Sequence, residues 1–111
     1  EEYAVKRTFT DYPQSAVNTA KRAIEYTEEN PNDCATATGR ARALQISKKE
    51  PISYDVVKRT FSFLSRAKTY DTGSFEDEDG NPVCGSISYA YWGGDSMRRW
   101  AEKKINEIEN A

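Results

Sequence analysis

One stretch near the C-terminus, Ile87–Ala101, constrains the fold of this chain more than any other. It contains both tryptophans, Trp92 and Trp100, on either side of the pair Gly93-Gly94. Asp95 follows the glycines, where a carboxylate can accept hydrogen bonds from the free N–H groups of a first helical turn. The stretch therefore predicts a short aromatic helix, a tight corner and a second helix capped by Asp95. The predicted structural keystone comprises Trp92, Gly93, Gly94, Asp95 and Trp100.

Three further segments carry apolar residues at helical spacing. The first is predicted to begin at Ser15 as N-cap and to end near residue 29. The second is predicted to begin after Asp33 as N-cap and must end before Pro51, because proline cannot continue a helix. Its predicted buried stripe consists of Ala37, Ala41 and Leu44, which would let it approach a neighbouring helix closely.

The third helix has the clearest start. Ser53 is its predicted N-cap, and Ile52 and Val57 are placed to form a hydrophobic staple around that cap. The short aromatic helix is predicted to start at Ser86, and the last helix to run from about Asp95 to residue 109. These helices predict an all-α fold, a small domain of four or five helices over residues 15–111 with the third and last at its centre.

Residues 1–14 and 69–85 fall outside the helical pattern. The first segment alternates Tyr3, Val5, Arg7 and Phe9 on one side, which is typical of a short strand or an extended arm. A strand has no evident partner in this domain unless the second segment supplies one, so we favour an arm, one that can pair with another subunit. The second segment is predicted to be an acidic loop with a turn at Asp79-Gly80 and room for a small hairpin.

The composition argues against several functional classes. The chain has no histidine, so the commonest general base and metal ligand are missing. The acidic run does not match a calcium-binding EF-hand loop, because Phe75 and Ser86 occupy ligand positions. No apolar run approaches the roughly 18 residues of a membrane span. We therefore predict that the protein is not an enzyme, holds no cofactor or metal, takes no small-molecule substrate and does not enter a membrane.

The two cysteines, Cys34 and Cys84, allow a single disulfide, but the sequence cannot establish it. We favour two reduced, partly buried thiols, as expected in a cytoplasmic protein.

Charge is distributed unevenly along the chain. Residues 40–68 carry eight basic and two acidic side chains, whereas residues 71–81 carry five acidic and no basic ones. The basic set is the candidate binding surface, facing a polyanion or another protein, although it can equally be a solvated face balanced by the acidic loop. It consists of Arg40, Arg42, Lys48, Lys49, Lys58, Arg59, Arg66 and Lys68.

The keystone residues also allow two binding roles. Trp92, Trp100 and Tyr89 would suit a platform for stacking nucleobases, and Gly93-Gly94 could cradle a phosphate at a helix N-terminus. We favour a structural role for both, because the tryptophans lie on apolar stripes and the charge of Asp95 would repel an anion. A buried Trp100 predicts a loss of roughly 3–5 kcal/mol on replacement by alanine.

From residue 37 onward the order of motifs resembles a small helical module of tailed bacteriophages. The resemblance lies in Arg40-Ala41-Arg42-Ala43-Leu44, in residues 48–53, in Val57-Lys58-Arg59-Thr60-Phe61-Ser62-Phe63, in Trp92-Gly93-Gly94-Asp95 and in Arg99-Trp100-Ala101. It covers about residues 15–104. The chain departs from the family pattern at Arg66-Ala67, where members often have Arg-His, and in its acidic loop.

The family occurs in phage head and structural proteins, alone or attached to head-maturation protease or portal-type proteins. The resemblance thus implies a helical fold, a virion or host-cytoplasm location and no catalytic residues. We expect a non-enzymatic, capsid-associated structural protein that makes protein–protein contacts with other phage structural proteins. The alternative is a nucleic-acid-binding module that uses the basic face of the second and third helices.

Overall fold

The computed structural model describes residues 8–110. The elements in chain order are β1 (Thr8–Phe9), α2 (Gln14–Glu29), α3 (Ala37–Ser47), β2 (Ile52–Ser53), α4 (Tyr54–Ala67), the 3-10 turn η1 (Lys68–Tyr70), α5 (Cys84–Tyr91) and α6 (Gly94–Glu109). The described residues are 66% helical, with five α-helices and a single two-stranded sheet. The predicted all-α class is confirmed.

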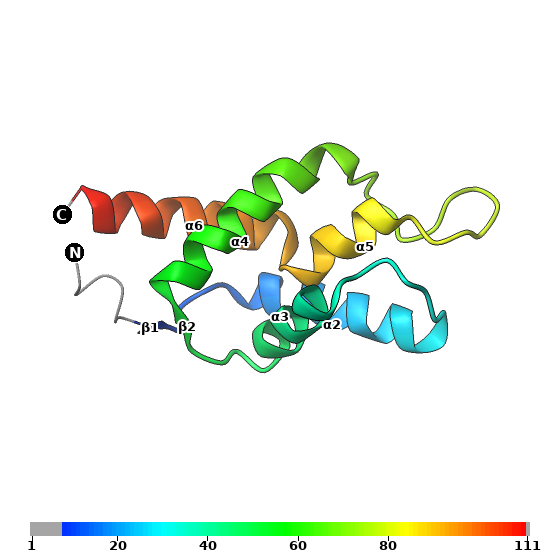
Figure 1. Cartoon of the computed structure of the whole chain (residues 1–111), viewed down its shortest axis with the longest axis horizontal. Helices are drawn as coiled ribbons and strands as arrows, with labels where there is room; N and C mark the ends of the chain where they lie inside the picture. The colour runs from blue at the N-terminus through cyan, green and yellow to red at the C-terminus, as the bar shows by residue number, and fades with distance from the viewer. Residues whose placement is uncertain (1–7, 111) are drawn as a thin grey trace.

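The helices pack as two groups, α4 with α6 and α2 with α3 and α5, along an elongated molecule of 49 × 24 × 22 Å (Figure 1). The most extensive helix pairing is between α4 and α6, and α2 packs against α3, α5 and α6. Leu64 of α4, Met97 of α6, Ile87 of α5 and Ile46 of α3 are all completely buried. The core therefore lies where the two groups meet, with α4 and α6 as its largest pair.

The start of α4 agrees with the sequence prediction. Ser53 is the N-cap, and its Oγ accepts a hydrogen bond from the Val56 N–H at 3.2 Å. Ile52 and Val57, the predicted staple, are both buried. Asp55 lies in the first turn, where its negative charge is favourable to the helix dipole.

The predicted N-caps of the first two helices are wrong by two and three residues. Helix α2 begins at Gln14 after Pro13, and the hydroxyl of Ser15 instead hydrogen-bonds to Ser96 at 2.7 Å. Helix α3 is capped by Thr36, whose Oγ1 accepts from the Gly39 N–H at 3.0 Å, and not by Asp33. At α3 a neighbouring residue of similar capping ability takes the position, whereas Pro13 at the N-cap position of α2 makes no side-chain capping hydrogen bond.

The predicted stripe of α3 is also wrong. Its buried residues are Gly39, Ala43 and Ile46, whereas Leu44 is 48% exposed, and Ala37 and Ala41 are exposed. A Cβ added at Gly39 would lie 3.4 Å from Nε1 of Trp92, so the small residue allows a close approach to that ring. The helix has small residues on two sides, and its neighbours determine which side is buried.

The N-terminal segment docks on its own domain and is not wholly a free arm. Strand β1 pairs antiparallel with β2, with Thr8 opposite Ser53 and Phe9 opposite Ile52. Tyr12 is completely buried, and its hydroxyl donates to the Glu50 carbonyl at 2.7 Å. The partner strand thus precedes α4 and lies neither in the acidic loop nor in another subunit. The rest of the predicted arm, residues 1–7, lies outside the described residues.

The Trp92–Trp100 corner depends on its glycines. Gly93 has φ +104° and Gly94 φ +69°, and a Cβ at Gly93 would lie 2.4 Å from the Cβ of Met97. Only glycine fits both the conformation and the space. Gly93 occupies the N-cap position of α6.

Two other predictions for this corner need correction. Asp95 is not the N-cap of α6. It lies in the first turn of that helix, and its carboxylate accepts a hydrogen bond from the Tyr89 hydroxyl. Trp92 is 8% exposed, as predicted, whereas Trp100 is only partly buried against Phe9 and Tyr12. The T-shaped contacts with Phe9 and Tyr12 cover only part of the Trp100 ring.

The acidic loop forms a small hairpin, as the sequence allowed. Glu76 and Pro82 form an antiparallel bridge, and Oδ1 of Asp77 accepts from the N–H groups of Asp79 and Asn81, each at 2.9 Å. Phe75 packs on Tyr26 of α2 and so ties the base of the hairpin to the body.

The helix after this loop begins earlier than predicted. Ser86 does not cap α5, which starts at Cys84. Ser86 lies inside the helix, where its Oγ accepts from the Thr72 N–H at 2.9 Å.

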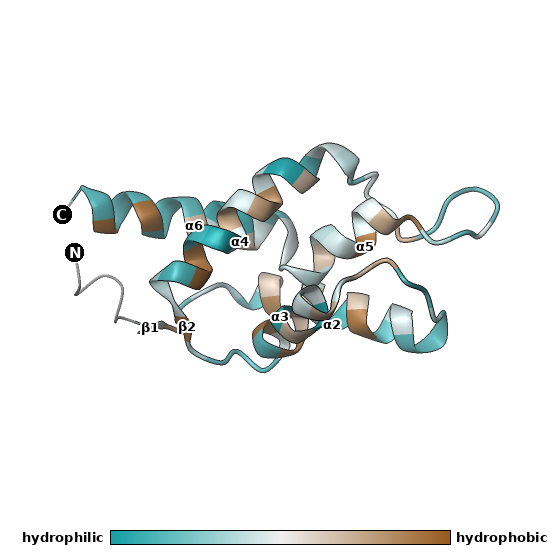
Figure 2. Ribbon diagram, in the orientation of Figure 1, coloured by the Kyte–Doolittle hydropathy of each residue, from teal (hydrophilic) through white to brown (hydrophobic). Residues whose placement is uncertain are grey.

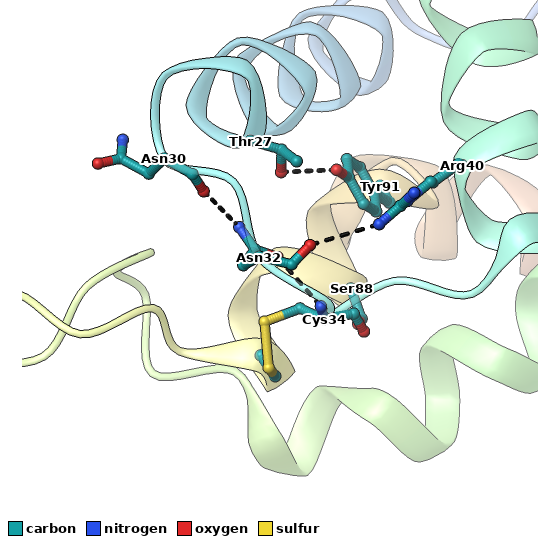
Figure 3. The surroundings of a disulfide bond; sticks show 8 residues. Thr27, Asn30, Asn32, Cys34, Arg40, Ser88 and Tyr91 are labelled. Carbon is teal, nitrogen blue, oxygen red and sulfur yellow. Dashed lines mark hydrogen bonds between the residues drawn. A yellow bond between two sulfur atoms is a disulfide. The ribbon is translucent and has the colours of Figure 1, made fainter.

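Cys34 and Cys84 form a disulfide, so the prediction of two reduced thiols is wrong. The bond joins the segment between α2 and α3 to the start of α5 (Figure 3). One hydrogen bond reinforces the link, because the Ser88 hydroxyl of α5 donates to the Cys34 carbonyl at 3.1 Å, and a local one, from the Cys34 N–H to Oδ1 of Asn32 at 3.1 Å, shapes the segment before α3. Fifty residues separate the two cysteines, too many for local sequence to reveal their contact.

Two buried tyrosines predict a loss of stability at high pH. Burial and then Glu50 raise the pKa of Tyr12 to about 12, and burial and the hydrogen bond to Asp95 raise that of Tyr89 to about 12. An unfolded tyrosine has a pKa near 10, so between about pH 10 and 12 the unfolded chain loses these protons first. We expect the free energy of unfolding to fall in that window, by at most about 1.4 kcal/mol per pH unit for each tyrosine.

Urea titrations at several pH values check this expectation. The variant Tyr89→Phe, which has no phenol to titrate, should show a shallower decline. An equal slope for the variant and the native chain above pH 10 would contradict the assignment.

Candidate functional site

A hollow of about 390 Å³ opens between α3, α4 and α5. Its floor is aromatic: the rings of Phe63 and Trp92 stack with centroids 4.8 Å apart and planes inclined by 25°. One wall is the segment 34–36, which the disulfide holds in place. Ser62, Ser88 and Tyr91 complete the apolar and hydroxyl-bearing lining.

A second hollow of about 330 Å³ continues the first along α4, since both are lined by Phe63, Arg66 and Ser88. It ends at Tyr70, whose side chain is 70% exposed. We call the two hollows together the α4 groove.

Two of the predicted basic residues, Arg59 and Arg66, line this groove, and a third, Arg42, lies over the ring of Trp92. The Arg42 guanidinium lies 5.4 Å from the centroid of the Trp92 ring, and Arg59 and Arg66 line the first hollow. Burial and then repulsion from Arg59 lower the pKa of Arg42, which places the two guanidinium groups within electrostatic reach of each other. Asp55 partly compensates Arg59 at 3.5 Å, in an ion pair that is largely exposed and therefore weak.

The other five predicted residues do not line the groove. Arg40 donates to the Asn32 carbonyl and lines a separate hollow beside α2 (Figure 3). Lys58 lies over the Tyr54 ring at 5.0 Å. Lys48 and Lys49 follow the last turn of α3, and Lys68 follows α4. The predicted basic residues therefore lie on separate parts of the surface, and the ones that lie close together are Arg42, Arg59 and Arg66.

The predicted aromatic platform is also divided. Trp100 packs on Phe9 and Tyr12, and Tyr89 lines a different, more polar hollow of about 480 Å³ together with Asp95 and Gly94. The stacking partner of Trp92 is Phe63. Phe63 is partly buried, so its ring is available at the surface of α4.

Three observations on the described residues bear on metal binding and on the predicted phosphate cradle. Between residues 8 and 110, no group of three or more His, Cys, Asp or Glu side chains is placed to hold a metal ion. Both cysteines are consumed by the disulfide, so neither is a thiol nucleophile. Asp95 is engaged with Tyr89 beside the glycine corner, where its charge opposes phosphate binding.

The comparisons with known proteins add no relative. Neither a family model, nor a curated protein, nor a solved structure matches this chain. Within the described residues, none of the helices combines the length and apolar character needed to cross a membrane.

Proposed function

We propose that this chain is a non-enzymatic bacteriophage structural protein, associated with the head, that binds other proteins of the particle through the α4 groove. The observation that carries the proposal is the groove itself: a stacked aromatic floor beside three arginines. Tryptophan, tyrosine and arginine are the side chains that most often dominate binding energy at protein interfaces. The resemblance of residues 15–104 to a phage module supplies the phage context.

The disulfide is compatible with this location. Disulfides persist in oxidising surroundings and are rare in proteins that remain in a reducing cytoplasm. A component of a released particle spends its working life outside the cell, where the Cys34–Cys84 bond is stable.

Mass spectrometry of purified particles tests the proposal. We expect the chain in the particles at a defined copy number, and we expect the double variant Arg59→Glu with Arg66→Glu to be lost from them while remaining folded. The matched control is Arg99→Glu with Lys103→Glu, which changes the same charge on two exposed positions of α6 and should be retained. Particles without the native chain would contradict the proposal.

Nucleic acid is the second candidate ligand, because arginines beside an aromatic surface also suit phosphates and bases. The net charge of −2 and the placement of Arg42 over Trp92 weigh against it. A phosphate-binding groove would bind duplex DNA with an affinity that falls steeply with salt and that disappears in Arg59→Ala with Arg66→Ala. We expect no such binding, and its detection at low salt would favour this candidate over the first.

A further inference from the structure

The acidic hairpin projects from the body at the end of the molecule opposite the C-terminal end of α6 (Figure 1). It is hydrophilic along most of its length (Figure 2). Residues 71–81 carry five carboxylates and no basic side chain. The hydrogen bonds of Asp77 and the Glu76–Pro82 bridge hold the tip in a defined shape.

Within residues 8–110, no ion pair joins a carboxylate of this hairpin to a cation. The ion pairs among the described residues join Arg59 to Asp55 and Lys104 to Asp11 and Glu107. Glu76 accepts a hydrogen bond from the Tyr26 hydroxyl, and Glu78 and Asp79 at the tip are exposed. A cluster of like charges held in one shape without counter-charges is disfavoured on its own and favoured beside a basic surface.

The α4 groove has the complementary chemistry. Arg59 and Arg66 are exposed beside the Phe63–Trp92 floor and can pair with carboxylates. The charges of two parts of the same chain, which lie on different elements, are thus complementary.

We infer that the α4 groove of one copy binds the acidic hairpin, residues 71–82, of a second copy. The inference rests on the proposed function only in using the same groove, and it names the partner there. Because groove and hairpin are different surfaces, the contact is head-to-tail. Such contacts build rings when the rotation closes and filaments when it does not. Each copy would then offer one free groove and one free hairpin until the assembly closes.

A charge-exchange experiment tests the inference. The groove variant is Arg59→Glu with Arg66→Glu, and the hairpin variant is Glu78→Lys with Asp79→Lys. Either variant alone places like charges on the groove and on the hairpin. In an equimolar mixture, the groove of each variant meets a hairpin of opposite charge on the other variant. The control is again Arg99→Glu with Lys103→Glu, which moves the net charge from −2 to −6 as the groove variant does. Circular dichroism and thermal unfolding verify that every variant is folded.

Sedimentation velocity gives the readout. We expect the native chain and the control to associate as protein concentration rises at about 0.05 M salt. At about 0.5 M salt the association should be at least about tenfold weaker, because screening shortens the range of the electrostatic attraction. Each variant alone should remain monomeric, and the mixture should recover the association.

Two results would overturn the inference: a native chain that is still monomeric at about 1 mM, or self-association that survives both variants. The two proposals fail separately. Particles that contain a monomeric chain would remove the head-to-tail contact and keep the structural role. A self-associating chain that is absent from particles would do the reverse.

Discussion

Replacing Cys34 and Cys84 together by serine is expected to lower the free energy of unfolding by about 4 kcal/mol. The bond closes a loop of 50 residues, and in the chain-entropy account a closure of that size removes this much freedom from the unfolded chain. The Cα atoms lie 4.8 Å apart, within the normal range for a disulfide, so the native backbone accommodates the bond. The midpoint of thermal unfolding should fall by roughly 15–20 °C.

Thermal unfolding with and without a reducing agent measures this effect. The native chain under reducing conditions should match the double serine variant, and the reducing agent should leave the variant unchanged. A loss below about 1 kcal/mol would mean that the Ser88 hydrogen bond and the surrounding packing already hold the two segments together.

Replacing Trp92 by alanine is expected to cost about 3–5 kcal/mol of unfolding free energy, the range for large aromatics removed from a core. Trp92 is 8% exposed, stacks on Phe63 and lies beneath Arg42. Gly39 packs so closely against its ring that the space cannot collapse without moving α3. The cavity left by the substitution would therefore join the α4 groove and stay open.

Trp100→Ala is the matched comparison. Trp100 is only partly buried, and its aromatic neighbours, Phe9 and Tyr12, belong to the short N-terminal segment. We expect about 1–3 kcal/mol for this variant, less than the sequence alone suggested, because less area leaves water. Urea unfolding of both variants measures the order. A larger loss for Trp100 than for Trp92 would contradict the assignment of Trp92 as the better buried of the two.

The candidate site was only partly predictable. Arg59 and Arg66 stand seven residues apart on one helix, so the sequence placed them on one face, and the structure has both at the groove. The sequence could not place Arg42 beside Arg59 and Arg66, because that contact depends on how α3 packs against α5. The same packing separates Arg40, only two residues earlier, onto another surface. Spacing orders residues on one helix, whereas a surface shared by three helices requires their relative positions.

Short-range interactions along the chain are sufficient to predict that the helices exist, and they also predict the Ser53 cap, the glycine corner and the acidic turn. Each depends on interactions among residues a few positions apart, such as the Ser53–Val56 hydrogen bond or the positive φ of Gly93 and Gly94. Local chemistry is sufficient there, because the competing conformations are also local.

Long-range packing determines which side of α3 is buried and where β1 pairs. It also brings the cysteines together and forms the groove. Tyr12 reaches Glu50 across 38 residues, and Cys34 reaches Cys84 across 50. Helix α3 has small residues on two sides, so its own sequence leaves the choice open. The free energy that makes each choice comes from burying distant surfaces together, and that quantity is a property of the packed chain and not of any one segment.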